Sequence, residues 1–134
     1  METIEPNTDK NTYSGNTKSK HEMSWTTDAD FDSVMNCPIC GFFCTHLTNL
    51  EVYARQEDEK TVTKVSTDLY SGKTTIETIE GHADNPSARR HGQILKGYCE
   101  SGCNFNIEIS QHKGNTFFRP EHTGHNEVTY PKNR

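Results

Sequence analysis

The sequence predicts a mainly β protein whose antiparallel sheet is held together by a bound metal ion. Several short segments alternate apolar and polar residues, and four of the five cysteines form two closely spaced pairs. Alternation of this kind is typical of half-buried strands, and no segment has an apolar pattern of helical period for more than a turn or two. The 134 residues are the size of a single domain.

The first 30 residues are predicted to form a disordered, polar and acidic arm. Residues 1–36 carry seven acidic and three basic side chains, which account for −4 of the total charge of −5. A stretch dominated by Asn, Thr, Lys and Ser cannot bury enough apolar surface to offset the entropy of ordering its backbone. Trp25, Phe31 and Val34 are candidates to anchor the arm. The expected organisation is an arm over 1–30, a metal-stapled β domain over 31–120 and a polar tail over 121–134.

The two cysteine pairs predict one structural zinc site. Cys37 and Cys40 belong to a C-P-x-C-G turn, while Cys99 and Cys103 flank Glu-Ser-Gly. A glycine in each tight turn lets two thiolates face one ion, and four thiolates at about 2.3 Å close a tetrahedral shell with no position for a catalytic water. Iron bound by four thiolates would use the same spacing, so the identity of the metal stays open.

Other residues near the pairs are alternative ligands. Cys44 or His46 could replace one of the four cysteines, although a half-buried thiol and a histidine hydrogen-bonded within the sheet are the simpler interpretations. His122 and His125 form a further, weaker candidate pair in the polar tail. An odd number of cysteines argues against a closed disulfide framework.

The 58 residues between the pairs are too many for a simple metal-binding ribbon and must contain structure of their own. Two segments rich in β-branched residues flank a turn at 70–73 and predict an inserted hairpin. The last strand is expected to stop before Pro120. The result is a five- or six-stranded antiparallel sheet with strands over 50–55, 61–67, 74–79, 93–98, 105–111 and 116–119.

Motifs for catalysis fail on inspection. Gly72–Thr74 is similar to the end of a phosphate-binding loop, but Thr67 stands where that motif requires its first glycine. Asp28, Asp30 and Asp32 alternate as in a calcium loop, yet the glycine and the closing glutamate of that loop are missing. No segment has the signature of a nucleophile elbow. The sequence therefore predicts a protein that is not an enzyme.

The N-terminus lacks a basic start and an apolar run, and no stretch approaches the ~20 apolar residues that span a bilayer. A cytoplasmic protein is expected, in a compartment where thiols stay reduced and cysteine pairs are more often metal ligands than disulfides.

Candidate partner-binding residues lie on two exposed turns. Arg89, Arg90 and His91 follow an Asn-Pro turn, and His112 and Lys113 lie in a turn between two predicted strands. Arginine forks suit phosphate or carboxylate groups. The alternative is a solvated loop whose arginines pair with neighbouring acids. Residues 85–134 carry a net charge of +3, but the acidic total argues against a dedicated nucleic-acid binder.

Five short segments together resemble small uncharacterised zinc-ribbon proteins of bacteria and bacteriophages. They are Cys37–Gly41, Cys44–Arg55, Asn85–Gly92 with its N-P-S-x-R-R-x-G pattern, Cys99–Cys103, and Ile109–Thr116 with Q-H-K-G. The second cysteine pair departs from the two-residue spacing common in such proteins, and the likeness covers about residues 37–119.

The resemblance implies a zinc-ribbon-like sheet with a long hairpin insertion, in the cytoplasm of a bacterium or of the host of a phage. The function expected is a protein-interaction module, an adaptor or inhibitor of a host or bacterial factor. A nucleic-acid-binding zinc ribbon is the alternative, because the C-terminal half is mildly basic.

Overall fold

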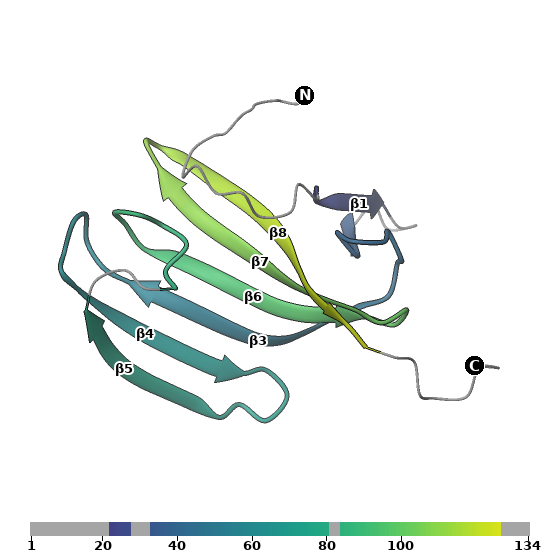
Figure 1. Ribbon diagram of the computed structural model, residues 1–134, viewed down its shortest axis with the longest axis horizontal. Helices are drawn as coiled ribbons and strands as arrows, with labels where there is room; N and C mark the ends of the chain where they lie inside the picture. Colours follow the sequence, from purple (N-terminus) through teal and green to yellow (C-terminus); the bar gives the residue numbers. More distant parts are fainter. Residues whose placement is uncertain (1–21, 28–32, 81–83, 127–134) are drawn as a thin grey trace.

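The computed structural model describes residues 22–27, 33–80 and 84–126, and in these ranges it consists of strands and turns without a helix (Figure 1). The prediction of a mainly β protein is confirmed. Within the same ranges no helix is long and apolar enough to cross a membrane. Most of the predicted N-terminal arm and the end of the predicted tail lie outside the described residues.

The main sheet has six antiparallel strands in the spatial order β5-β4-β3-β6-β7-β8 (Figure 1). The inserted hairpin is present as β4 and β5, which leaves β3 and β6 paired at the centre although they are far apart in the sequence. The strands are β3 (Thr45–Ala54), β4 (Thr61–Asp68), β5 (Thr74–Glu80), β6 (Gly92–Cys99), β7 (Cys103–His112) and β8 (Asn115–His125).

A separate two-stranded sheet precedes the main one. β1 (Ser24–Thr27) pairs with β2 (Ser33–Asn36), and the side-chain amide of Asn36 donates a hydrogen bond of 2.8 Å to the hydroxyl of Thr26. Met23 and Met35 pack against the core next to the cysteines. Part of the segment predicted as an arm is therefore a strand. Its side chains are too polar to fold alone, but pairing with β2 satisfies the backbone hydrogen bonds of β1.

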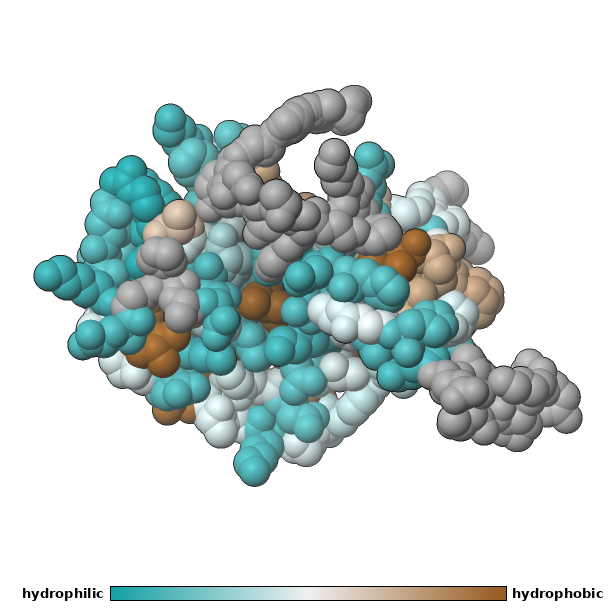
Figure 2. All heavy atoms as spheres, viewed as in Figure 1, coloured by the Kyte–Doolittle hydropathy of each residue, from teal (hydrophilic) through white to brown (hydrophobic). Residues whose placement is uncertain are grey.

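Each face of the main sheet carries its own small core. Side chains alternate along a strand, so Leu95 and Ile107 share one face while Ile94 and Glu108 share the other. The surface in Figure 2 is accordingly mostly hydrophilic, with apolar residues in separate small groups. One cluster consists of Cys37, Cys99, Cys103, Phe105 and Ile107, and the second of Tyr53, Val62 and Ile94.

The last strand continues beyond Pro120 to His125, where the sequence prediction ended it at Arg119. Pro120 is buried opposite Ile107. β8 is an edge strand, and an edge strand tolerates proline because half of its backbone amides have no ladder partner to lose. The predicted polar tail thus begins with five residues of strand.

Gly97 in β6 leaves no room for a side chain. An added Cβ would lie 2.5 Å from the backbone oxygen of His46 and 3.1 Å from the ring of Phe105. We expect Gly97→Ala to lower the free energy of unfolding by about 1–3 kcal/mol, the usual cost of overpacking, measured by urea denaturation. Gly124→Ala is the control, because its nearest neighbour would be 3.7 Å away. Equal stability of the two variants would contradict the prediction.

Candidate metal centre

In the first cysteine turn, a backbone amide points at the sulfur of a cysteine. The amide of Gly41 donates to the carbonyl of Cys37 at 2.9 Å, and the amide of Cys37 donates to the carbonyl of Phe42 at 2.8 Å. The amide of Ile39 points at the sulfur of Cys37, 3.4 Å away. Gly41 has a φ of +84°, a conformation that favours glycine. This is the turn that the C-P-x-C-G pattern predicts.

The second turn accommodates its three intervening residues through Gly102. The φ of Gly102 is +110°, and its amide donates to the carbonyl of Cys99 at 3.0 Å. An added Cβ at this position would lie 2.6 Å from the carbonyl oxygen of Asn126. The amide of Glu100 also donates to the carbonyl of Cys44 at 3.1 Å, which ties this turn to the residue just before β3.

The four predicted ligands converge. The sulfur atoms of Cys37, Cys40, Cys99 and Cys103 all lie within 4.8 Å of one another, and those of Cys40 and Cys99 are 3.6 Å apart. A tetrahedron with metal–sulfur bonds of about 2.3 Å has edges of about 3.8 Å, so the arrangement fits one ion. All five cysteines, including Cys44, are free thiols. The group is therefore a plausible metal site.

Burial and hydrogen bonds shift the pKa values of three of the thiols in opposite directions. Burial raises the pKa of Cys37 and of Cys103. Burial also opposes ionisation of Cys99, but hydrogen bonds from the Ser101 hydroxyl and from the amides of Cys103 and Ser101 outweigh it and lower the pKa of Cys99 to about 6. A bound cation would favour the thiolate forms of these buried sulfurs. The hydroxyl of Ser101, 3.2 Å from the sulfurs of both Cys40 and Cys99, was not anticipated from the sequence.

The alternative ligands Cys44 and His46 are not members of this cysteine group. Cys44 is half-buried, and His46 is engaged elsewhere, with its Nε2 2.7 Å from a carboxylate oxygen of Glu100. Its ring also stacks on Tyr98 at a centroid distance of 5.0 Å.

The two predicted partner-binding segments lie together at the end of the sheet opposite the cysteines. The loop that holds Arg89, Arg90 and His91 is fastened to the end of β7 by the Ser87 hydroxyl, which accepts a bond of 3.0 Å from the amide of Gln111. His112 ends β7, and Lys113 follows it in the turn before β8.

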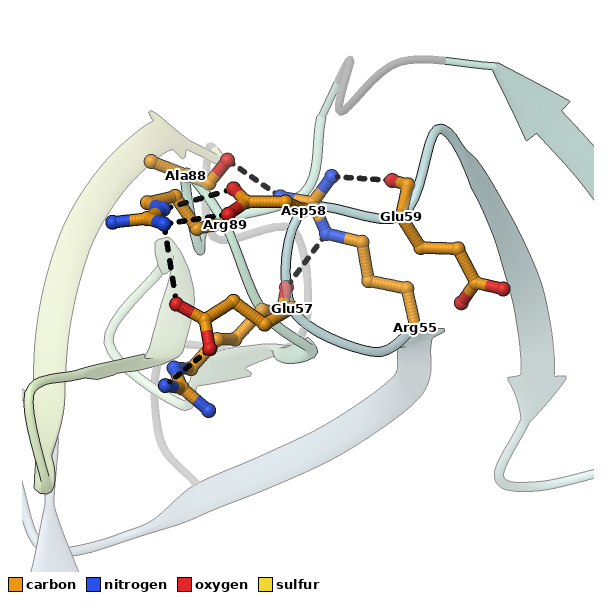
Figure 3. A network of polar contacts seen from close by, with 7 residues as sticks. Arg55, Glu57, Asp58, Glu59, Ala88 and Arg89 are labelled. Atoms are coloured by element: carbon orange, nitrogen blue, oxygen red, sulfur yellow. Dashed lines mark hydrogen bonds and ion pairs between the residues drawn. The ribbon is translucent and has the colours of Figure 1, made fainter.

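The two arginines are engaged in ion pairs with the turn between β3 and β4 (Figure 3). Arg89 binds the carboxylate of Asp58 through Nε at 2.8 Å and through a second nitrogen. Its hydrogen bond to Asp58 holds the pKa of that carboxyl below its ordinary value. Arg90 pairs with Glu57 at 2.9 Å. This geometry matches the alternative prediction of a solvated loop whose arginines pair with neighbouring acids.

Arg55, just after β3, holds the same loop beside the turn between β3 and β4 by donating hydrogen bonds to backbone carbonyls. Its guanidinium donates to the carbonyl oxygens of Glu59 at 3.2 Å and of Ala88 (Figure 3). It also donates to the carbonyl oxygens of Arg90 at 3.1 Å and Ser87 at 3.3 Å. The sequence gives no local sign of this role, because the loop lies more than 30 positions away along the chain.

A cavity of about 620 Å³ opens on the face of the sheet that carries Tyr53. Two pairs of opposite charge lie in its lining, with Lys96 3.2 Å from Glu51 and Arg119 3.7 Å from the buried Glu108. The hydroxyl of Tyr53 donates to Glu51 at 3.0 Å, and burial raises the pKa of this tyrosine. The lining residues come from five strands and the loop before β6, so the sequence alone did not reveal the cavity.

Comparison with known proteins adds nothing to this geometry. No protein-family model, no curated protein and no solved structure matches the chain. The likeness to small zinc-ribbon proteins stays a prediction from the sequence motifs.

Removal of a metal ion held by the four cysteines is expected to unfold the protein. Structural metal in small domains contributes roughly 10–16 kcal/mol of apparent binding free energy, more than a core of this size can supply. Treatment with a chelator, or the change Cys37→Ser, should abolish the dispersed amide spectrum in NMR. Cys44→Ser is the matched control and should keep both the metal and the fold. A purified chain without stoichiometric metal, or one that stays folded after chelation, would contradict the expectation.

Arg55→Ala is expected to destabilise the loop more than Arg89→Ala combined with Arg90→Ala. Loss of Arg55 removes the hydrogen bonds of one charged donor to four carbonyls, which should cost about 1–3 kcal/mol in total. The exposed ion pairs of Arg89 and Arg90 are screened by water, so their loss should cost less. Thermal denaturation compares the variants, and hydrogen exchange locates the change in residues 84–91. A double variant less stable than Arg55→Ala would reverse the ranking.

Proposed function

We propose that this protein is a non-enzymatic, zinc-stabilised module for protein interaction. Four cysteine thiolates are a donor set that suits zinc, and they would leave no coordination position open for substrate or water. The donor set supports a structural role for this ion. Elemental analysis distinguishes zinc from iron, which the same thiolates would accept.

The observation that carries the proposal is the open edge of the sheet at β5. Six of its seven residues are exposed, and the side chain of Ile76 is 70% exposed. β5 contains neither lysine nor proline, and its register with β4 has no bulge. Natural proteins usually protect an edge with one of these devices. The other edge strand, β8, carries Pro120 and a bulge.

The backbone of β5 is arranged to accept another strand. The amide of Asp68 donates to the carbonyl of Lys73 at the hairpin turn, which sets the alternation of hydrogen-bonded pairs along the ladder. By that alternation the amides of Ile76 and Thr78 point away from β4. An extended segment of a partner could pair with them by strand addition.

The charges on β5 favour a partner other than a second copy. Symmetric antiparallel pairing of two copies centred on Glu77 would place this carboxylate opposite itself, and like charges directly opposite are destabilising. We therefore propose an extended partner segment with basic side chains that face Glu77 and Glu80. The sequence resemblance suggests a host or bacterial factor, with this protein as its adaptor or inhibitor.

The residues predicted from the sequence to meet a partner, Arg89, Arg90, His91, His112 and Lys113, are proposed as a second contact at the loop end of the sheet. In such a contact, acidic side chains of the partner would replace Glu57 and Asp58 as the ion-pair partners of Arg89 and Arg90. No observation specifically favours nucleic acid, because these arginines face Glu57 and Asp58 and the chain has a net charge of −5.

The edge proposal is tested by capture of a partner on the immobilised protein. Ile76→Lys places a charge on the open edge, and Thr78→Pro removes an outward amide, so each should reduce capture at least tenfold while the fold stays intact. Phe118→Lys on the opposite edge strand is the matched control, since Phe118 is 52% exposed. The captured partner should also protect the amides of Ile76 and Thr78 from hydrogen exchange.

Unchanged capture by both β5 variants would exclude this edge. If capture is lost instead with Arg89→Ala and Arg90→Ala combined, the interface lies at the loop end. Binding of labelled DNA or RNA at low salt that weakens steeply as salt rises would support the nucleic-acid alternative.

A further inference from the structure

We propose that Cys103, His122 and His125 bind a second divalent metal ion, with the thiolate of Cys103 shared between the two centres. The sulfur of Cys103 and one ring nitrogen from each histidine lie within 4.8 Å of one another. Cys103 is buried, whereas both histidines are exposed. The site would therefore join the buried cysteine group to exposed side chains of the edge strand β8.

A bulge in β8 creates this cluster. Residues three apart on a regular strand point to opposite faces, so His122 and His125 would normally diverge. In this sheet His125 lies opposite Cys103 and His122 lies opposite Phe105, while Thr123 is the extra residue between them. The additional residue restores a common face, and bulges often re-aim side chains at functional sites.

The second cysteine turn is shaped to receive His125. A Cβ added at Gly102 would lie 2.9 Å from Nε2 of His125, so this glycine allows the ring to approach. The amide of Asn126 donates to the carbonyl of Gly102 at 2.7 Å, and the side-chain amide of Asn126 donates to that of Asn104 at 3.2 Å. These bonds hold the end of β8 against the turn and are independent of the histidine side chains.

The chemistry of the three ligands selects borderline ions such as Zn²⁺, Co²⁺ or Ni²⁺. Imidazole and thiolate both suit these ions, and a thiolate has lone pairs for two of them. The rings of His122 and His125 meet edge to face with centroids 6.5 Å apart. Three protein ligands leave a fourth tetrahedral position for water, in contrast to the closed shell of four cysteines.

Titration with Co²⁺ and Zn²⁺ tests the proposal on the full chain. The wild type should bind two equivalents of metal, measured by elemental analysis after gel filtration and by the visible absorption of Co²⁺. His122→Ala and His125→Ala should each bind one equivalent and stay folded, since neither change touches Cys37, Cys40 or Cys99. His91→Ala, which removes an exposed histidine outside the cluster, is the control and should retain two.

Deletion of Thr123 is a second test, because it removes the bulge without removing a ligand. The two histidines should then face opposite sides of the strand, and the second equivalent should be lost. A wild type that binds a single equivalent with micromolar free metal present would overturn the proposal, as would histidine variants that still bind two. Absence of all metal would instead refute the four-cysteine centre, so the two failures are distinguishable.

Discussion

The convergence of two cysteine turns is the constraint on which the rest of the structure depends. Cys40 and Cys99 are 59 positions apart, yet their sulfurs lie 3.6 Å from each other. Their meeting places the start of β3 beside the end of β6, and these two strands form the centre of the sheet. Because the apolar clusters on the two faces are small, an ion at this point would supply stability that the side-chain packing lacks.

The sheet has two different ends and two different edges. The cysteines occupy one end, while the opposite end consists of turns joined by Arg55 and by ion pairs. β8 carries a proline and a bulge, whereas β5 is regular and exposed. This asymmetry separates the part of the molecule that holds it together from the surface on which a partner strand is proposed to bind.

Two interpretations of the charges at Arg89 and Arg90 are possible from the sequence: recognition of a partner, or ion pairs within the chain. Arg89 and Arg90 in a loop suggest recognition of phosphate or carboxylate groups. The acids that they meet are Glu57 and Asp58, from a turn that no local motif connects to this loop. Within one chain such pairing costs little conformational entropy once the sheet has brought the turns together, so the fold supplies partners that the sequence does not display.

The features that depend on local spacing could be predicted from the sequence. Alternating apolar residues, runs of β-branched residues and turn residues marked the strands of the main sheet, and the two glycine-containing turns marked Cys37, Cys40, Cys99 and Cys103 as one group. These signals are readable because strand period and turn geometry depend on neighbouring residues.

The features that depend on the register between distant strands could be seen in the folded structure alone. The pairing of β1 with β2, the extension of β8 beyond Pro120 and the cavity beside Tyr53 are examples. The clearest is Thr123, whose single unpaired position turns two histidines toward one cysteine. A shift of one residue in register exchanges the faces of a strand, and no short window of sequence contains that information.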